Sequence, residues 1–214
     1  RLVGSEMCIR DSTGTVEDGL FPSTYRVKWD IVGDPKVSIL IPNKDHIDDL
    51  EKCLHSLWAK TSWDNFEVIV IENNSTDPET FAYYQKAQQC YDGLQVVIYP
   101  KKGFNFSRIN NFGRKYATGD YLLLLNNDVE VRNADWLTEL LRQCAHPGGA
   151  AICGAELFYP DETLQHAGVI TGLGGYAGHS HKYKKAGGSG YMFRAATVQD
   201  LSAVTGACLL VKTS

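Results

Sequence analysis

Apolar and polar positions along the chain follow two periods, which predict a repeating pattern of strands and helices. Residues 37–41 form a continuous run of mainly β-branched side chains that ends at Pro42. Such a run is typical of a strand buried on both faces. A helical stripe then follows Asp45, the expected N-cap, at Ile47, Leu50, Leu54, Leu57 and Trp58.

The same alternation continues to the end of the chain. Asp77 followed by Pro78 predicts a helix start, because an aspartate cap and a first-turn proline suit that position. Further strands are predicted at residues 25–31, 66–71, 94–99, 121–125, 150–153 and 207–211, and further helices at 107–117 and 134–144. Strands joined through helices need right-handed crossovers. We therefore predict an α/β, Rossmann-like doubly wound, mainly parallel sheet with helices on both faces.

Three segments depart from this pattern. Residues 1–12 resemble translated sequencing-adapter read-through, and we expect them to be non-native. Residues 13–36 are expected to be a linker with the lead-in strand, and residues 37–214 the main domain, incomplete at its C-terminus. Within that domain, residues 172–190 are rich in glycine, with Tyr, His and Lys between, which favours an active-site loop without core elements.

Charge and composition narrow the range of partners. The net charge of −4 gives no basic field for nucleic acid, although Lys182, Lys184 and Lys185 form a local basic spot. The cysteines form no CxxC pair, which argues against a disulfide framework or zinc ribbon and favours a cytoplasmic protein. The apolar run at 121–125 is far shorter than the roughly 20 residues of a membrane-spanning helix.

Polar residues gather where the predicted strands end, which is where an open parallel sheet binds ligands. Residues 42–45, 72–75 and 126–130 are rich in carboxylate and amide groups. No GxGxxG and no GxxxxGK[ST] is present, so a phosphate group would need another partner. A divalent cation held by Asp128 would supply it. Residues 126–128 equally favour a plain turn, and these residues alone leave both interpretations open.

Other polar residues also keep two interpretations. Glu72 and Asn73 suit an ordinary strand-to-helix loop, and His46 and His55 suit a helix surface. The spacing of His166, His179 and His181 matches no structural zinc pattern. These three histidines are either ligand contacts, loop-ordering groups or exposed loop residues.

Seven segments together resemble one family in order and spacing. They are VSILIPNKD at 37–45, VIVIENNSTD at 68–77, FNFSRINNFG at 104–113, GDYLLLLNNDVEV at 119–131, LQHAGVITGLGG at 164–175, GHSH at 178–181 and SAVTGACLLV at 202–211. The chain resembles the family-2 inverting glycosyltransferases of GT-A fold, in their bacterial rhamnosyltransferase-like branch.

The resemblance implies a role for individual residues. Nucleotide-binding positions are implied at Pro42, Asn43, Asp45, Glu72, Asn74, Arg108, Asn111 and Asn127. Glu72 stands where an aspartate is more usual. Asn127 and Asp128 match a reduced Asp-x-Asp motif, with Asp128 as the ligand of Mg²⁺ or Mn²⁺. Contacts with donor or acceptor are implied for His166, His179 and His181.

The implied activity is transfer of a sugar with inversion, in cell-surface polysaccharide synthesis. The donor would be a dTDP- or UDP-linked sugar, with rhamnose suggested for this branch, and the acceptor a saccharide or lipid-linked saccharide. A cytoplasmic location is implied, with peripheral association at the inner membrane face as an option. The implied catalytic base lies C-terminal to residue 214, and Asp161, Glu162 and Asp200 are nearby carboxylates within the chain.

Two alternatives belong to other classes. A fragment without the base would bind the sugar nucleotide without turnover. An oxidoreductase would need a glycine-rich first turn, which Pro42, Asn43 and Lys44 do not provide.

Overall fold

A computed structural model describes residues 13–213 of the chain. The expected adapter-derived segment, residues 1–12, lies outside the described residues. The chain forms two compact units, Arg1–Val32 with Glu139–Thr205, and Gly33–Thr138 with Gly206–Ser214. We call them the hairpin unit and the sheet unit. The chain passes from the sheet unit to the hairpin unit within helix α4 (Trp136–Cys144).

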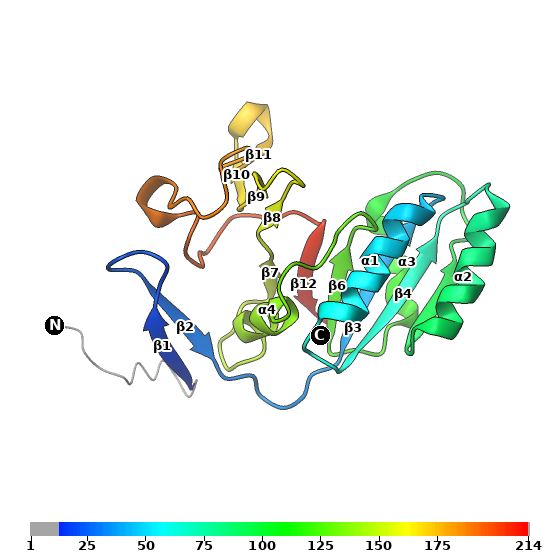
Figure 1. Cartoon of the computed structure of the whole chain (residues 1–214), viewed down its shortest axis with the longest axis horizontal. Helices are drawn as coiled ribbons and strands as arrows, with labels where there is room; N and C mark the ends of the chain where they lie inside the picture. The colour runs from blue at the N-terminus through cyan, green and yellow to red at the C-terminus, as the bar shows by residue number, and fades with distance from the viewer. Residues whose placement is uncertain (1–12, 214) are drawn as a thin grey trace. The chain divides into compact units, whose positions relative to one another are not determined.

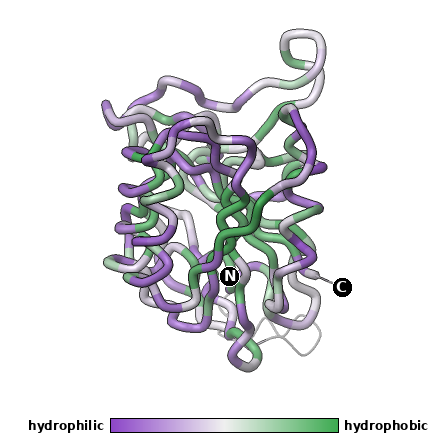
Figure 2. The backbone as a smooth tube through the Cα atoms, turned by 90° about the vertical axis from the view of Figure 1, so that its right-hand side faces the viewer, coloured by the Kyte–Doolittle hydropathy of each residue, from purple (hydrophilic) through white to green (hydrophobic). Residues whose placement is uncertain are grey.

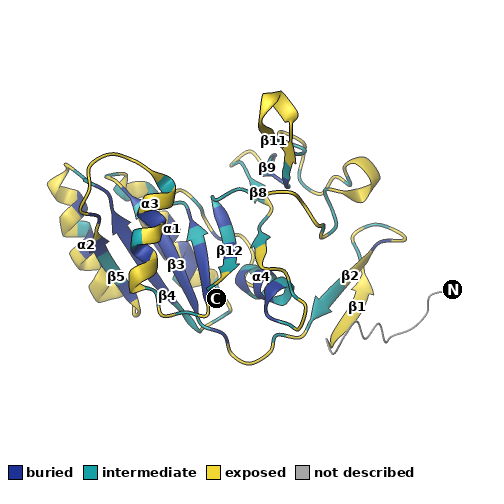
Figure 3. Cartoon of the chain, turned by 180° about the vertical axis from the view of Figure 1, so that it is seen from behind, coloured by how far each residue is buried: buried dark blue, intermediate teal, exposed yellow. Residues whose placement is uncertain are grey.

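The sheet unit is built on a mainly parallel sheet with the strand order β5-β4-β3-β6-β12 (Figure 1; β5 is labelled in Figure 3). The central strand β3 pairs in parallel with β4 and β6, β4 pairs in parallel with β5, and β12 is antiparallel to β6. Their bounds are Val37–Asn43 for β3, Phe66–Glu72 for β4, Leu94–Ile98 for β5, Tyr121–Leu125 for β6 and Cys208–Lys212 for β12. The predicted doubly wound α/β sheet is therefore confirmed.

Helices lie on both faces of this sheet. They are α1 (Ile47–Lys60), α2 (Pro78–Cys90) and α3 (Phe106–Gly113), which continues into the short helix η1 (Arg114–Tyr116). The order reverses after β5, since β6 lies on the other side of β3. Right-handed crossovers therefore place α1 and α2 on one face and α3 on the other. The strands between them are the most buried part of the unit and the most hydrophobic (Figures 2 and 3).

The face under α3 shows how closely helix and sheet approach. Leu40, Ile69, Ile71 and Ile109 belong to one buried cluster there. A Cβ built at Gly113 would lie 2.3 Å from Ile71 Cδ1, so a side chain at this position would push the helix away from β4. The glycine of the FNFSRINNFG segment thus has a packing role.

The helix starts confirm one expected cap and correct another. Asp77 caps α2, and its carboxylate accepts a hydrogen bond from the Glu79 N–H at 2.9 Å. The expectation for Asp45 was wrong, because His46 is the N-cap residue of α1 and makes no side-chain capping bond. Asp45 and His46 both have left-handed backbones, with φ of 53° and 48°, and the Asp45 carboxylate bonds elsewhere.

The hairpin unit contains three short antiparallel strand pairs among its described residues. Its first pair, β1 (Gly14–Asp18) with β2 (Tyr25–Trp29), includes the predicted lead-in strand. Arg142 of α4 donates to the Trp29 carbonyl at 2.7 Å. The remaining elements are β7 (Ile152–Gly154), β8 (Leu157–Phe158), β9 (Leu164–His166), β10 (Val169–Thr171), η2 (Leu173–Gly175), β11 (Ala177–His179) and η3 (Tyr191–Phe193).

Residues 172–190 contain no buried residue, in keeping with the expected loop without core elements, but they are not wholly irregular. They contain β11, which pairs with β10 in a hairpin, and β8 pairs with β9 beside it. The paired strands are only two or three residues long, too short for a period to be read from the sequence. Among the helices of residues 13–213, none is long and apolar enough to cross a bilayer.

Candidate functional site

A cleft of about 300 Å³ lies at the carboxyl ends of β3, β4 and β6. The strand order reverses on either side of β3, so this is the topological switch point at which open α/β sheets bind ligands. Residues from all three strand ends line this one cleft, as expected from the sequence. The lining residues are Pro42, Asn43, Lys44, His46, Asn73, Asn74, Gly103, Phe104 and Asn127.

Glu72 lies behind the cleft wall and is 1% exposed. Its carboxylate accepts hydrogen bonds from the Ser75 N–H and hydroxyl, each at 2.5 Å, and from the Tyr84 hydroxyl at 2.8 Å. Both oxygens are therefore occupied by groups of the protein. In this structure Glu72 shapes the loop after β4, and it does not line the cleft as the resemblance implied for a nucleotide-binding residue.

Asn43 joins this buried group to the cleft surface. Its amide nitrogen donates to the Tyr84 hydroxyl and to the Asp45 carbonyl, both at 2.8 Å. Its amide oxygen accepts from the Asn127 side chain at 2.7 Å. The ends of β3, α2 and the turn after β6 are thereby connected through one side chain.

Asp45 holds the loop that carries Asn73 and Asn74. Its carboxylate accepts from the backbone N–H groups of Asp77 and Thr76, at 3.1 and 2.9 Å. These two bonds, led by that of Asp77, lower the pKa of the Asp45 carboxyl. Asn74 also has a left-handed backbone, with φ of 62°. Strained non-glycine residues are found preferentially at functional sites.

The turn after β6 is fixed to helix α1. The Ser56 hydroxyl accepts from the Val131 N–H at 3.0 Å, and Lys60 donates to the Val131 carbonyl at 2.8 Å. Burial, with a smaller effect of the nearby Asp128 carboxylate, raises the pKa of the Cys53 thiol to about 12. The thiol therefore stays protonated beneath this turn, while Asp128 and Glu130 are exposed.

The carboxylate of Asp128, on the turn after β6, fits a divalent cation that is shared with a phosphate ligand. Mg²⁺ is usually held by one or two carboxylates together with substrate phosphates and waters, and Asp128 offers an exposed carboxylate on a fixed turn. Within residues 13–213 no cluster of three or more His, Cys, Asp or Glu side chains has the arrangement of a metal site. A cation would thus depend on oxygens of its ligand.

Only some of the implied nucleotide-binding residues line the cleft. Pro42, Asn43, Asn74 and Asn127 line the cleft. Arg108 and Asn111 are exposed on α3, and neither they nor Asp45 are among the lining residues. Sequence reasoning did not single out Phe104, whose side chain is 73% exposed at the cleft rim. Its place in the polar, glycine-containing loop after β5 was the available signal.

The histidines of the hairpin unit form a separate cluster. Nδ1 of His166 lies 3.0 Å from Nδ1 of His179, and Nε2 of His166 accepts from the Thr205 N–H at 3.3 Å. Nδ1 of His166 must therefore carry the proton in the neutral pair. Burial, with a smaller effect of His179, lowers the pKa of His166 to about 4. His166 orders this unit from within, since it is 1% exposed.

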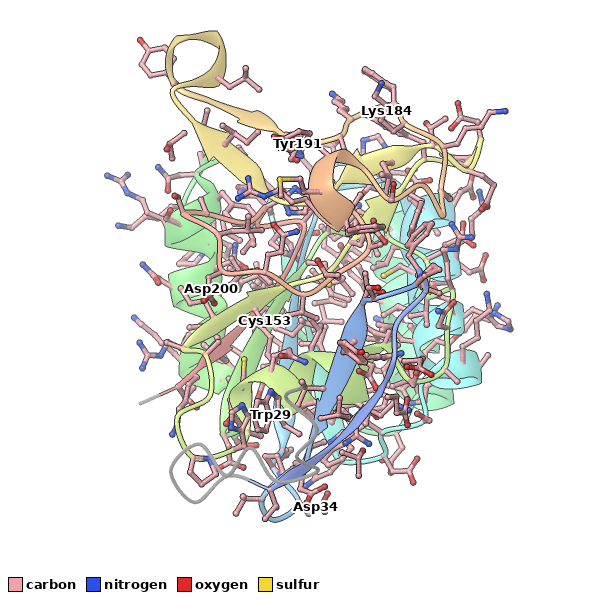
Figure 4. All side chains as sticks on the ribbon, turned by 90° about the vertical axis from the view of Figure 1, so that its left-hand side faces the viewer. Trp29, Asp34, Cys153, Lys184, Tyr191 and Asp200 are labelled. Atoms are coloured by element: carbon pink, nitrogen blue, oxygen red, sulfur yellow. The ribbon has the colours of Figure 1, made fainter. Side chains whose placement is uncertain are left out.

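The third histidine, His181, is half-buried in the hairpin unit, and its neighbours Lys182 and Tyr183 are exposed. His181 Nδ1 is 2.5 Å from the Ser180 hydroxyl. Tyr159 and Tyr183 are stacked with ring centroids 5.4 Å apart, and the Lys182 ammonium lies 5.0 Å from the Tyr183 ring. Figure 4 labels Lys184 and Tyr191, two exposed side chains of the same region.

Known proteins share this fold and sequence pattern. A mannosyltransferase from Pyrobaculum calidifontis, solved with GDP-mannose and Mn²⁺, has a TM-score of 0.54 over 61% of this chain and 38% of its own, at 18% identity. This likeness shows the GT-A fold of glycosyltransferases. Residues 38–197 match the model of glycosyl transferase family 2. The chain belongs to this family, which confirms the resemblance to family 2 seen in the sequence.

Curated relatives are much longer than this chain. The O-antigen biosynthesis protein RfbC of Myxococcus xanthus is 45% identical over 158 residues, which are 74% of this chain and 12% of RfbC. The uncharacterized protein y4gI of Sinorhizobium fredii is 39% identical over 194 residues, 91% of this chain and 21% of that protein. The chain thus spans about a fifth or less of the length of these relatives.

Proposed function

We propose that the sheet unit binds a nucleoside diphosphate sugar, with a divalent cation, for transfer of the sugar to a saccharide acceptor. The observation that carries this proposal is the cleft at the switch point of a family-2 chain, lined by residues of three strand ends, with the amides of Asn73, Asn74 and Asn127 among them. Amide groups can both donate to and accept from a base and a ribose, whose polar atoms are of both kinds.

The nucleoside would lie against Asn73, Asn74 and Phe104. Asn74 donates to the Lys101 carbonyl at 2.8 Å, which joins the loops after β4 and β5 into one wall. The exposed Phe104 ring at the rim offers an apolar face on which a base can stack. In this proposal Glu72 acts from behind the wall, because its carboxylate is already fully engaged.

The diphosphate would lie toward the turn after β6. Asp128 would hold Mg²⁺ or Mn²⁺ there, with Glu130 as the next carboxylate along the turn. When bound, the cation supplies positive charge that offsets the charge growing on the departing diphosphate. Asp128 itself contributes a fixed carboxylate, since α1 and Asn43 anchor the residues on either side of it.

Inversion requires the acceptor hydroxyl to attack on the face opposite the diphosphate, helped by a base. In this proposal the base lies outside residues 13–213, as the resemblance implies. Asp161 is poorly suited, because its carboxylate already accepts from the Thr163 hydroxyl at 2.6 Å and N–H at 3.0 Å. These bonds lower the pKa of Asp161, which makes it a weaker proton acceptor.

A named relative supports a proposal for the biological role. RfbC, to which residues of this chain are 45% identical, is an O-antigen biosynthesis protein. We infer that a protein of this kind acts in cell-surface polysaccharide synthesis, in the cytoplasm or at the inner membrane face. A dTDP- or UDP-linked donor, with rhamnose as the transferred sugar, is our proposal for the substrate.

Titration calorimetry of the whole chain with UDP and dTDP, each with Mg²⁺ or with EDTA, tests this proposal. We expect binding that is stronger with the cation, and we expect Asp128→Ala to lower the cation-dependent affinity by about 100-fold. Asp92→Ala is the matched control, because Asp92 is an exposed aspartate in the turn before β5, at the opposite end of the sheet. Equal affinities with Mg²⁺ and with EDTA would contradict the proposed cation site.

A further inference from the structure

We propose that Glu72, Tyr84 and Asn43 form a positioning relay that fixes the side-chain amide of Asn127 beside the cation site. The relay turns the amide nitrogen of Asn127 inward and its oxygen toward the cleft. This inference rests on the proposed function, since its effect appears at the Asp128 cation. None of the three relay residues is a catalytic residue, because they act through Asn127.

The hydrogen bonds of the relay all run in one direction. Asn127 donates to Asn43 at 2.7 Å, Asn43 donates to Tyr84 at 2.8 Å, and Tyr84 donates to Glu72 at 2.8 Å. Each donor points along the relay toward the Glu72 carboxylate, which can only accept when it is ionised. The negative end therefore sets the direction of every bond before it, and such chains strengthen each bond cooperatively.

Burial keeps water away from the hydrogen bonds of the relay, so water cannot replace one of their donors or acceptors. Glu72, Asn43 and Tyr84 are 1%, 2% and 4% exposed. A reversed amide at Asn43 would place its oxygen against the Tyr84 oxygen and the Asp45 carbonyl, leaving buried acceptors without donors. A buried polar group without a hydrogen-bond partner costs more free energy than an exposed one. The observed orientation of the Asn43 amide is therefore strongly favoured.

The consequence appears at Asn127, where the relay reaches the cleft surface. An amide presents its nitrogen and its oxygen in different directions, so the bond to Asn43 leaves Oδ1 on the far side. Among the described residues, no donor hydrogen-bonds to Asn127 Oδ1. This oxygen is a hard, uncharged ligand of the kind that suits Mg²⁺. An aspartate here would set a second acceptor against Asn43 Oδ1.

Two adjacent tyrosines in α2 provide a matched test. Tyr84→Phe removes only the hydroxyl that joins Asn43 to Glu72. Tyr83→Phe makes the same change one residue earlier, where the buried hydroxyl has no hydrogen-bond partner among the described residues. Affinity for UDP and dTDP is measured by calorimetry on the whole chain, with Mg²⁺ and with EDTA, and folding is checked by thermal unfolding.

We expect Tyr84→Phe to lower the cation-dependent gain in affinity about tenfold, while the affinity in EDTA changes by less than about twofold. Tyr83→Phe should match the wild type under both conditions. The relay is overturned if the two variants show the same cation-dependent gain, or if Tyr84→Phe weakens binding equally with and without the cation. Absence of cation-dependent binding in the wild type would instead contradict the proposed function.

Glu72→Gln provides a second variant if Tyr84→Phe does not fold. Glutamine keeps the shape of Glu72 but replaces one acceptor by a donor, so the Tyr84 hydroxyl loses its fixed partner. We expect a loss of about threefold to fivefold in the cation-dependent gain, again with little change in EDTA. A cation-dependent gain equal to that of the wild type would overturn the relay.

Discussion

Strand β4 carries a buried glutamate near each end, and the two differ in how their charge is compensated. Glu67, at the amino end, accepts from the Lys36 ammonium at 2.8 Å and the Ser38 hydroxyl at 2.6 Å. The Thr118 N–H adds a further bond at 2.7 Å. Glu72, at the carboxyl end, accepts only from uncharged groups.

The difference shows in the surroundings of each end. Burial raises the pKa of Glu67, but the bonds from Lys36, Ser38 and Thr118 outweigh it and lower the pKa overall. That network closes the gap between β3, β4 and the segment before β6. The cleft of about 520 Å³ at this end, lined by Asp34, Ser62, Trp63, Asp64 and Asn65, contains none of the network residues. At the other end the neutral donors lead outward to Asn127 and the exposed Asp128.

A buried carboxylate therefore does not by itself identify a binding site. A carboxylate neutralised by its own lysine stabilises the fold. A carboxylate whose donors are neutral can orient further polar groups that reach the surface. Stability and nucleotide affinity, measured together on the same variants, separate these two roles.

The largest effect is expected for Glu67→Ala, which leaves Lys36, Ser38 and Thr118 without their common acceptor. The free energy of unfolding should fall by about 2–3 kcal/mol, measured by urea denaturation. Nucleotide affinity of the folded protein should stay within about twofold of the wild type, since the proposed nucleotide cleft lies at the carboxyl end of the sheet. Glu79→Ala, at an exposed position in α2, is the control and should change stability by less than about 0.5 kcal/mol.

Acid should affect the two units in different pH windows. The folded pKa of His166 is about 4, below an unfolded value near 6.5, so the unfolded state binds more protons between these values. Stability therefore falls as the pH is lowered through this window, by about 2 kcal/mol at pH 5. His166→Gln should remove this slope in thermal unfolding at pH 4–7.5, and an unchanged slope would contradict the assignment.

Protonation of Glu67 should affect the stability of the fold only at lower pH. Its folded pKa lies below the unfolded value, so its contribution is present above the unfolded pKa and is lost as the pH falls through the folded pKa. Glu67→Gln should flatten the stability curve below about pH 4.5 and leave the His166 window unchanged. A change in the higher window would show that the two groups are coupled.

The smallest effects come from a matched pair of serines. Ser38 bonds Glu67 and accepts from the Gly119 N–H at 2.8 Å, whereas Ser75 bonds Glu72 and accepts from the Asp45 N–H at 2.8 Å. Ser38→Ala and Ser75→Ala should each lower the free energy of unfolding by about 1 kcal/mol. Only Ser75→Ala should weaken nucleotide binding, by about threefold. Equal affinities for the two variants would remove the functional distinction between the ends.

The sequence predicted the sheet because its strands are continuous apolar runs, which need no knowledge of their neighbours. It also predicted Asp77 as a cap, since an aspartate before a proline acts locally. The Asp45 cap failed because the left-handed backbone at Asp45 and His46 directs that carboxylate to the N–H groups of Thr76 and Asp77. These two N–H groups belong to another loop, so no local sequence pattern around Asp45 reveals the contact.

The candidate site was predictable in position and less so in detail. Strand ends gave Pro42, Asn43, Asn74 and Asn127, because parallel strands bring their carboxyl ends to one edge. The burial of Glu72 depends on Tyr84, which α2 brings back over the strand end. A contact of this kind is set by helix packing and cannot be read from either residue alone.

The most direct test of the carboxyl-end site uses Mn²⁺ as a paramagnetic probe in NMR spectra of the ¹⁵N-labelled chain. With Mn²⁺ and UDP or dTDP present, the side-chain amide signals of Asn43, Asn73 and Asn127 should broaden, while that of Asn65 at the amino end stays sharp. Asp128→Ala should abolish the broadening. Broadening of Asn65 together with the other three, or sharp signals from all four, would contradict a nucleotide and cation site at the carboxyl ends of β3, β4 and β6.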